Sequence, residues 1–271
     1  MRRSVWIRVV ISIILVCFFT ISLAVRNTDS RGEAKSTPVI TVETDNQPIY
    51  SQAIARSAAP KAIATPSETG NISQLKYQPN YEVIPVHPTN YGSRLVTDIN
   101  GVPVSNQPII VLHETVSSAA STINFFQTPH YEESKQASYH ALIKLDGTVV
   151  YLVPPEYRAF GAGNSVFDGA SGPEAVKTHP NFPPSVNNFA YHAALETPPS
   201  GRNNARRHSG YTEEQYRSLA WLIAQSSVPE DRITTHRAVD RSGTRIDPRS
   251  FNMNKFLQIL RDYKQQSTRN T

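Results

Sequence analysis

All eight histidines of this 271-residue chain, and all but a few of its aromatic residues, lie after residue 75. Residues 27–75 are instead rich in Ser, Thr, Ala, Pro and Asn, and their apolar positions follow neither the strand period nor the helix period. Such a segment buries too little apolar surface to form a core, so we interpret it as a flexible linker. We therefore expect one folded domain at residues 76–265, followed by a disordered tail at residues 266–271.

The first 26 residues carry the pattern of an export signal. Arg2 and Arg3 precede an apolar run at residues 9–25 that contains no charge. This pattern predicts either a signal peptide, cleaved after the small-x-small sequence that ends at Ala24, or an uncleaved anchor in the inner membrane. In both cases we expect the protein in the periplasm or cell envelope. It would contact a membrane only through this segment, if the segment is retained.

Charge and cysteine content limit the kinds of binding site that the folded domain can contain. Lys plus Arg is 27 against 22 acidic residues, but three of the cations are Arg2, Arg3 and Arg8, so cleavage would leave 24 basic and 22 acidic residues. The basic residues are not interleaved with aromatic ones, and we expect no nucleic-acid binding. Cys17 is the single cysteine and lies in the export segment. A metal site in the folded domain would therefore use histidine and carboxylate ligands.

Several short stretches of the folded domain have the pattern of β-strands. They lie at residues 108–112, 138–145, 148–153, 189–196 and 233–235. Asp146 and Gly147 separate the second stretch from the third and predict a hairpin. The first and last stretches each end directly before a histidine, His113 and His236 respectively.

Helix patterns fall between these strands. Ser118 can cap one helix, Thr212 begins a capping box before a second, and Asn252 or Asn254 can open a third. Interleaved strands and helices predict an α/β fold with a mixed central β-sheet flanked by helices. The segment 161–188 is too long for a plain connection, and loops of this length are usually functional.

Chemistry is best sought where strands end, because side chains can converge there at the edge of a rigid sheet. His113 and His236 each follow a strand, and Asp247 lies shortly after His236 in the sequence HRAVDRSGTRIDPRSF. Two imidazoles and one carboxylate suit a catalytic zinc site, since three protein ligands leave a fourth position for water. Taken alone this is a weak signal, because some of eight histidines fall at strand ends by chance.

The context of these residues strengthens the interpretation. The chain contains IIVLHET at 109–115, SYHALIKLDGTVVYLVPPEYRAFGAG at 138–163, NNFAYHAALE at 187–196 and THRAVDRSGTRIDP at 235–248. In this order the four stretches resemble the type 2 N-acetylmuramoyl-L-alanine amidases, whose zinc fold is shared by bacterial muropeptide amidases, phage amidases and peptidoglycan recognition proteins. They cover most of residues 108–250, and the second stretch is the most specific. The resemblance implies the amidase type 2 fold.

It also implies roles for individual residues. His113, His236 and Asp247 would bind Zn²⁺. Tyr139 matches a tyrosine that many catalytic members use beside the metal. Arg245 stands where the family commonly has lysine. Because a guanidinium does not release its proton at neutral pH, Arg245 is expected to stabilise negative charge on the carbonyl oxygen.

The acid/base residue departs from the family pattern. The family's catalytic glutamate follows an Ile-Gly-Ile strand, and the alignment puts Ala194 at that position and Glu196 two residues later. Glu196 shares a strand face with Ala194, so a small register shift or bulge would bring it over the metal. We expect Glu196 to be the general base, with Glu114 as the fallback. Gly161 stands where the family often has histidine, which removes one substrate contact.

The other histidines and the basic loop have simpler interpretations. His192 shares a face with Glu196 and is expected to be a hydrogen-bonded core imidazole. His140 is expected to pack under the sheet or to support a metal ligand. The side chains expected to face solvent are His87, His130, His179, His208, Arg202, Arg206 and Arg207.

The resemblance therefore implies a zinc-dependent hydrolase that cleaves the amide between the muramic acid lactyl group and L-Ala of the peptidoglycan stem peptide. Glu196 would take a proton from water, and Tyr139 and Arg245 would stabilise the oxyanion. Two alternatives stay open. The missing glutamate at position 194 favours a peptidoglycan-binding module without catalysis, and the same metal chemistry would serve a zinc peptidase acting within the stem peptide. The expected partner is peptidoglycan or a muropeptide, and the expected state is a monomer.

Overall fold

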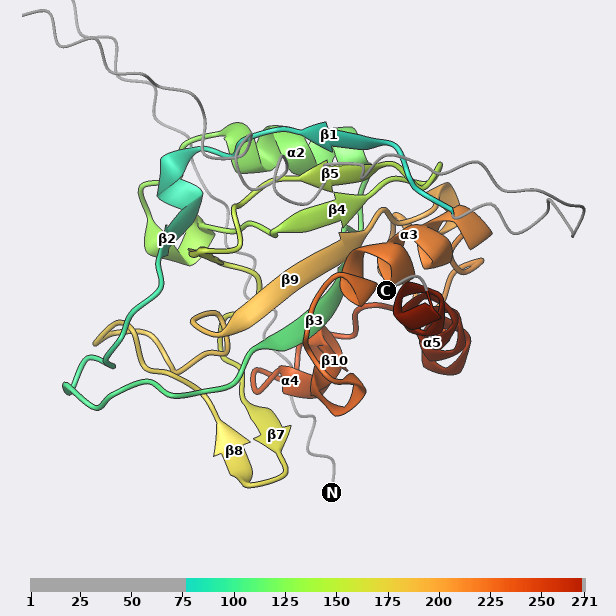
Figure 1. Ribbon diagram of the computed structural model, residues 1–271. Coiled ribbons are helices and arrows are strands. Elements are labelled where there is room, and N and C mark those ends of the chain that lie inside the picture. The colour runs from blue at the N-terminus through green and yellow to red at the C-terminus, as the bar shows by residue number, and fades with distance from the viewer. Residues whose placement is uncertain (1–76, 270–271) are drawn as a thin grey trace, which may run out of the picture. The chain divides into compact units, whose positions relative to one another are not determined.

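The computed structural model describes residues 77–269, so the predicted export segment and the whole of the predicted linker lie outside the described residues. A six-stranded sheet forms the centre of this part of the chain (Figure 1). Within residues 77–269, no helix combines the length and the apolar character needed to cross a membrane.

The central sheet is mixed, as the sequence predicts. Its strands, in spatial order, are β1 (Tyr81–Val83), β5 (Val149–Tyr151), β4 (Ala141–Ile143), β9 (Ala190–Leu195), β3 (Ile109–Glu114) and β10 (Ile233–Thr235). Only the β4–β5 pair is antiparallel, and the other neighbours run parallel. The carboxyl ends of β9, β3 and β10 therefore lie at the same edge of the sheet.

The antiparallel pair is the predicted hairpin, although its two strands are shorter than the sequence patterns that predict them. Gly147 occupies the turn with φ of +85°, a region that side-chain-bearing residues rarely adopt. A Cβ atom there would also lie 2.9 Å from side-chain atoms of Glu214, Ser218 and Tyr77. Glycine is thus required both for the turn and for the close approach of the neighbouring helix.

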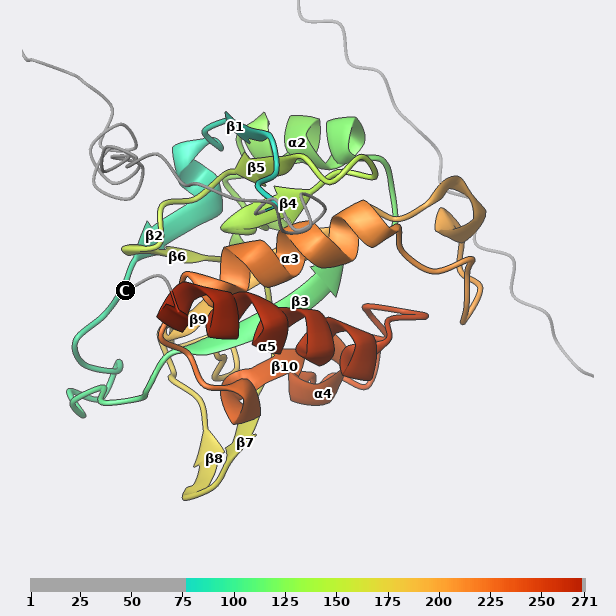
Figure 2. The ribbon, with the colours of Figure 1, turned by 45° about the vertical axis from the view of Figure 1, so that its right-hand side comes forward.

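Two helices cover one face of the sheet. Figure 2 shows α3 (Glu213–Ala224) and α5 (Met253–Arg269) side by side in front of β9 and β3. The predicted capping box is present, because Thr212 accepts from the Gln215 N–H and Gln215 accepts from the Thr212 N–H. Helix α5 opens at Asn252, whose side chain accepts from the Lys255 N–H. It runs to Arg269, into the segment that the sequence predicts as a disordered tail.

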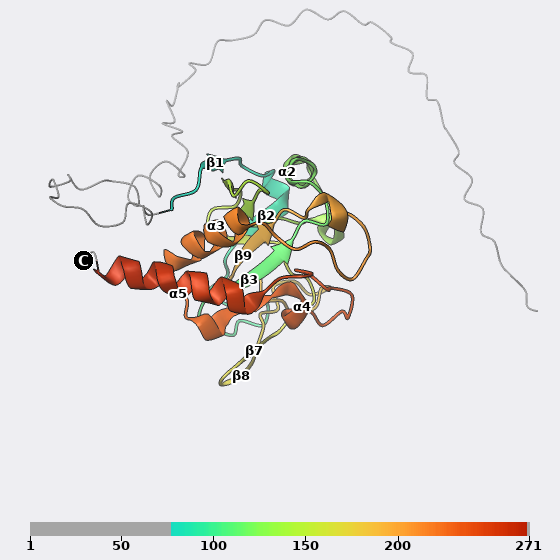
Figure 3. The same cartoon turned by 90° about the vertical axis from the view of Figure 1, so that its right-hand side faces the viewer.

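The opposite face is covered in two parts. Helix α2 (Ala119–Gln127), capped by Ser118, packs over β4 and β5 through a cluster that includes Ile123, Phe126, Leu142 and Val150. Figure 3 shows α2 on the side of the sheet away from α3 and α5. The long segment 161–188 packs over the amino-terminal parts of β3 and β9.

The remaining elements are short. They are β2 (Tyr91–Ser93) paired with β6 (Tyr157–Ala159), the hairpin β7 (Phe167–Gly169) with β8 (Gly172–Glu174), helix α4 (His236–Val239), and the 3-10 turns η2 (Pro88–Asn90), η3 (Glu133–Lys135), η4 (Pro199–Gly201) and η5 (Glu230–Arg232). The carboxyl-terminal residues of β3 are buried, since His113 is 0% exposed and Glu114 is 2% exposed.

Candidate functional site

Three side chains meet at the carboxyl ends of β3 and β10, and one of them is far from the other two in the sequence. His113 is the penultimate residue of β3, and His236 is the first residue of α4, directly after β10. Asp247 comes from the following loop, where the Arg237 N–H donates to its carbonyl oxygen at 2.9 Å. Because β3 and β10 are parallel neighbours, their ends lie together, as the sequence predicts.

These residues form a compact group of metal-ligating atoms. One ligand atom from each lies within 4.8 Å of the other two. His236 Nδ1 is 3.1 Å from the Asp247 carboxylate, and His113 Nδ1 is 3.5 Å from it. His113 Nδ1 is buried and has no hydrogen-bond partner within the described residues. A buried donor nitrogen without a partner, beside a second imidazole and a carboxylate, fits a divalent cation such as Zn²⁺.

The protonation states suit metal binding. Burial lowers the pKa of His113 to about 4, against the opposing effect of Asp247, so the ring is neutral at pH 7. Burial alone would raise the pKa of Asp247, but its close contacts with the His113 and His236 rings hold it below its ordinary value. The group therefore offers two imidazoles and one carboxylate anion, the donor set of many catalytic zinc sites.

A cleft of about 500 Å³ opens beside this group and is lined by Tyr139, His236 and Arg245, among others. The Tyr139 ring lies 4.7 Å from the His113 ring, measured between centroids. Burial, together with the Asp247 charge, raises the pKa of Tyr139, so its hydroxyl keeps its proton and can donate. The Arg245 guanidinium makes no hydrogen bond or ion pair within residues 77–269 and is exposed at the cleft. The structure therefore brings both predicted residues to the cleft.

Glu196 does not join this group. Its Oε1 accepts from the Ala119 N–H at 3.0 Å and from Arg202 at 3.1 Å, and its Oε2 accepts from the Leu145 N–H at 3.0 Å. The register shift or bulge that would bring Glu196 over the metal is absent, because β9 pairs with β3 regularly, with Ala194 opposite His113. Glu196 is instead an anchor at the amino-terminal end of α2, where an anion is favoured.

The fallback carboxylate, Glu114, is also committed elsewhere. It points to the opposite side of β3, where it is buried and contacts Arg249, His208 and Tyr211. His208 is thus not solvent-facing, as its loop position suggests, but has a fully buried side chain. Arg202 is likewise held by Glu196 rather than free in a solvated loop. Within the described residues, the ligand group contains no second carboxylate besides Asp247.

One contact of the site is missed by sequence reasoning. His192 is hydrogen-bonded and buried as expected, but its Nδ1 lies 2.9 Å from Nε2 of His113. The register of β9 against β3 places both side chains on the same face of the sheet, and the alternation of each strand alone does not show that they touch. His140 supports this arrangement, because its Nδ1 accepts from the His192 N–H at 2.9 Å.

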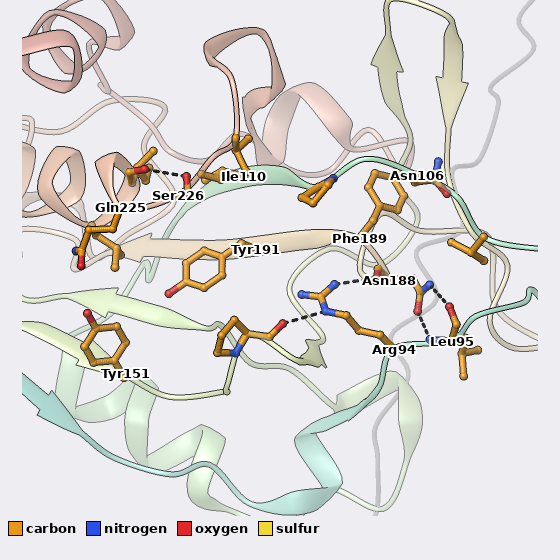
Figure 4. Close-up of a pocket in the computed structure, with 16 residues that line it drawn as sticks. Arg94, Leu95, Asn106, Ile110, Tyr151, Asn188, Phe189, Tyr191, Gln225 and Ser226 are labelled. Carbon is orange, nitrogen blue, oxygen red and sulfur yellow. Dashed lines mark hydrogen bonds between the residues drawn. The ribbon is translucent and has the colours of Figure 1, made fainter. Parts of the chain in front are cut away.

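A second cavity, of about 640 Å³, lies toward the other ends of β3 and β9 (Figure 4). Ile110, Tyr151 and Tyr191 line it, and none of its lining residues is a histidine or a carboxylate. Its cation, Arg94, is already bonded to the carbonyl oxygens of Pro155 and Asn188. This cavity therefore lacks the groups that hydrolysis needs.

Comparison with known proteins agrees with the geometry. The sequence model of a family described as N-acetylmuramoyl-L-alanine amidase matches residues 105–250, a range that contains all three residues of the ligand group. No curated protein matches the chain.

Three solved structures are similar at low identity. A selenomethionine derivative of AmpD is 21% identical with a TM-score of 0.47, over 68% of this chain and 96% of that one. AmiD from E. coli, in complex with the substrate anhydro-N-acetylmuramic acid-L-Ala-D-gamma-Glu-L-Lys, is 18% identical with a TM-score of 0.43, over 56% of this chain and 57% of that one. AmpDh3 from Pseudomonas aeruginosa, in complex with anhydromuramic pentapeptide, is 16% identical with a TM-score of 0.41, over 70% and 66% respectively.

Proposed function

This chain belongs to the N-acetylmuramoyl-L-alanine amidase family, and on that premise we propose that it is a zinc-dependent amidase of peptidoglycan. The bond cleaved is the amide between the muramic acid lactyl group and L-Ala of the stem peptide. The observation that carries the proposal is the group of His113, His236 and Asp247, with its buried, unpartnered Nδ1 atom.

His113, His236 and Asp247 would hold the zinc ion. When bound with three protein ligands, zinc lowers the pKa of a water molecule toward neutrality and polarises a carbonyl group. The protein's part is to keep the His113 imidazole neutral by burial and to keep the Asp247 carboxylate ionised. These states hold at neutral pH, where the enzyme is expected to work.

Tyr139 and Arg245 serve the oxygen of the scissile carbonyl. Both line the cleft, and the protonated Tyr139 hydroxyl can donate a hydrogen bond to that oxygen as negative charge develops on it. Arg245 adds a permanent positive charge whose geometry suits an oxyanion or a carboxylate of the stem peptide.

A second candidate function is a peptidoglycan-binding module that does not cleave. It is favoured by Ala194, which stands opposite His113, and by the engagement of both Glu196 and Glu114 in other contacts. No carboxylate is then offered as general base from these positions. The metal group argues for the amidase, since binding alone does not need three converging ligands.

Digestion of purified sacculi tests these functions. We expect the enzyme to release peptides that begin with L-Ala and to leave the glycan strands intact, as measured by mass spectrometry of the soluble fraction. A chelator and Asp247→Ala should each abolish release, whereas His87→Ala, which removes an imidazole outside the ligand group, should not.

Two results would contradict the proposal. Fragments that leave L-Ala on muramic acid would indicate a peptidase, and sedimentation with sacculi without any release would indicate a binding module.

We further propose that the protein acts on intact peptidoglycan of the cell envelope, because residues 1–26 have the pattern of an export signal. Cell fractionation with sequencing of the mature amino terminus tests this location and distinguishes a cleaved signal from an anchor. Recovery from the cytoplasm would contradict it.

A further inference from the structure

His192 is a buried imidazole beside the metal group that the proposed mechanism does not use. It lies on β9, and its side chain shares the sheet face of His113 on the neighbouring β3. The two rings have centroids 5.0 Å apart, and Nδ1 of His192 is 2.9 Å from Nε2 of His113. Both residues are 0% exposed, so water does not compete for this hydrogen bond.

The direction of the hydrogen bond follows from the metal group. His113 presents Nδ1 toward Asp247, and a neutral imidazole that binds a cation through Nδ1 carries its proton on Nε2. That proton lies between the two rings. His113 therefore donates it, and Nδ1 of His192 accepts it.

The second ring nitrogen of His192 makes burial of this side chain costly. Its Nε2 atom is buried without a hydrogen-bond partner in the described part of the chain, so the contact with His113 is the ring's one hydrogen bond there. An apolar residue of similar size would avoid that unsatisfied atom. A role in packing alone does not explain an imidazole at this position.

The surrounding residues fix the ring in place. The backbone N–H of His192 donates to Nδ1 of His140. The two imidazole rings stack at an interplanar angle of 9°. On the other side, a Cβ atom added to Gly161 would lie 2.5 Å from Cγ and Nδ1 of His192. Gly161, where the resemblance would place a histidine, thus leaves the space that the His192 ring needs.

We propose that His192 is a positioning residue for the metal: by accepting the Nε2 proton of His113, it fixes the tautomer and orientation in which His113 Nδ1 faces the cation. Gly161 is the second part of this arrangement, because it admits the ring. The inference rests on the proposed metal site, and it adds a residue that acts on the cation through His113. Partners of this kind tune metal affinity and not only packing.

A matched pair of variants tests the hydrogen bond. Asparagine and leucine have nearly the same shape, but His192→Asn keeps an acceptor near the position of Nδ1 and His192→Leu does not. The zinc dissociation constant of each purified protein is measured by competition with a chromophoric chelator. Urea unfolding of the zinc-free proteins is measured in parallel.

We expect His192→Leu to weaken zinc binding by about 10–100-fold, the usual effect of losing such a partner, without a matching loss of zinc-free stability. His192→Asn should restore most of the affinity. Equal affinity in the wild type and in His192→Leu would overturn the proposal, and so would equal weakening in both variants, which would indicate packing alone. Wild-type protein that binds no zinc would overturn the metal site itself, and this proposal with it.

Gly161 provides an independent test. Gly161→Ala should weaken zinc binding when His192 is present and should add little in the His192→Leu background, because the clash is with the imidazole. Gly163→Ala is the matched control, since a Cβ atom there meets nothing within 4 Å. An equal effect of Gly161→Ala in both backgrounds would show that the two positions are not coupled.

Discussion

The charge and exposure of Arg245 indicate a role in the reaction and not in the stability of the fold. Its side chain is exposed at the cleft, and the described residues offer it no ion-pair partner. Other arginines of the domain are engaged in pairs, such as Arg232 with Glu174 and Arg249 with Glu114. A cation left free beside the metal group is available to a substrate oxygen.

Arg245→Gln should therefore lower kcat by about 10²–10³-fold, the usual cost of removing one oxyanion donor, with little change in stability or zinc content. Arg245→Lys should recover much of the rate, because the lysine restores the cation. Turnover of released stem peptides and zinc content measured on the same preparations check this. An unchanged kcat in Arg245→Gln would remove Arg245 from the reaction.

Among the secondary-structure elements, β9 is followed directly by a residue, Glu196, that connects three other segments. Glu196 links the end of β9 to the amino terminus of α2 through Ala119, to the β4–β5 turn through Leu145, and to the turn after η4 through Arg202. Two backbone N–H groups and one guanidinium thus depend on a single carboxylate. On the other face of the sheet, the Glu114 carboxylate likewise connects segments, because it forms an ion pair with Arg249.

Glu196→Gln should therefore act on stability rather than on chemistry. In the variant, the NH₂ group of the glutamine would face one of the two backbone N–H groups that now donate to the carboxylate, and that N–H group would lose its acceptor. We therefore expect the free energy of unfolding to fall by about 1–3 kcal/mol. Turnover per folded molecule should be nearly unchanged. Urea unfolding and a rate normalised to folded protein separate the two effects, and loss of turnover at full stability would restore Glu196 as the general base.

At the scale of the whole molecule, folding buries several histidine rings and lowers their pKa, so that they stay neutral. His140 illustrates the cost: burial lowers its pKa to about 3, and the Arg94 guanidinium, 3.3 Å from Nε2, also disfavours the charged ring. The unfolded chain regains an ordinary histidine pKa of about 6.5. Between these two values the unfolded state binds more protons than the folded state, so stability falls as the pH falls.

We therefore expect zinc-free protein to lose stability as the pH is lowered from about 6.5 toward 4, by up to roughly 1.4 kcal/mol per pH unit for each such imidazole. Urea unfolding at pH 7.5 and 5.5 measures the loss. In His140→Asn, which keeps an acceptor for the His192 N–H, the loss should be smaller by the contribution of one imidazole. An equal loss in both proteins would contradict this account of His140.

Local chemistry in the sequence predicted much of this fold. The hairpin at Asp146-Gly147 and the capping box at Thr212 depend on neighbouring residues alone, and the structure confirms both. The convergence of His113 with His236 was also predictable, because strand ends that carry histidines gather at one edge of a sheet.

Contacts between distant segments were decided only by the tertiary structure. The sequence places Glu196 on the correct face of its strand, but which backbone N–H groups meet its carboxylate depends on where α2 and the β4–β5 turn pack. The contact of His192 with His113 likewise depends on strand order and register. Hydrophobic periodicity and helix capping depend on residues that are close in the sequence. The hydrogen-bond partner of a buried polar atom depends instead on which distant segment the fold places next to it.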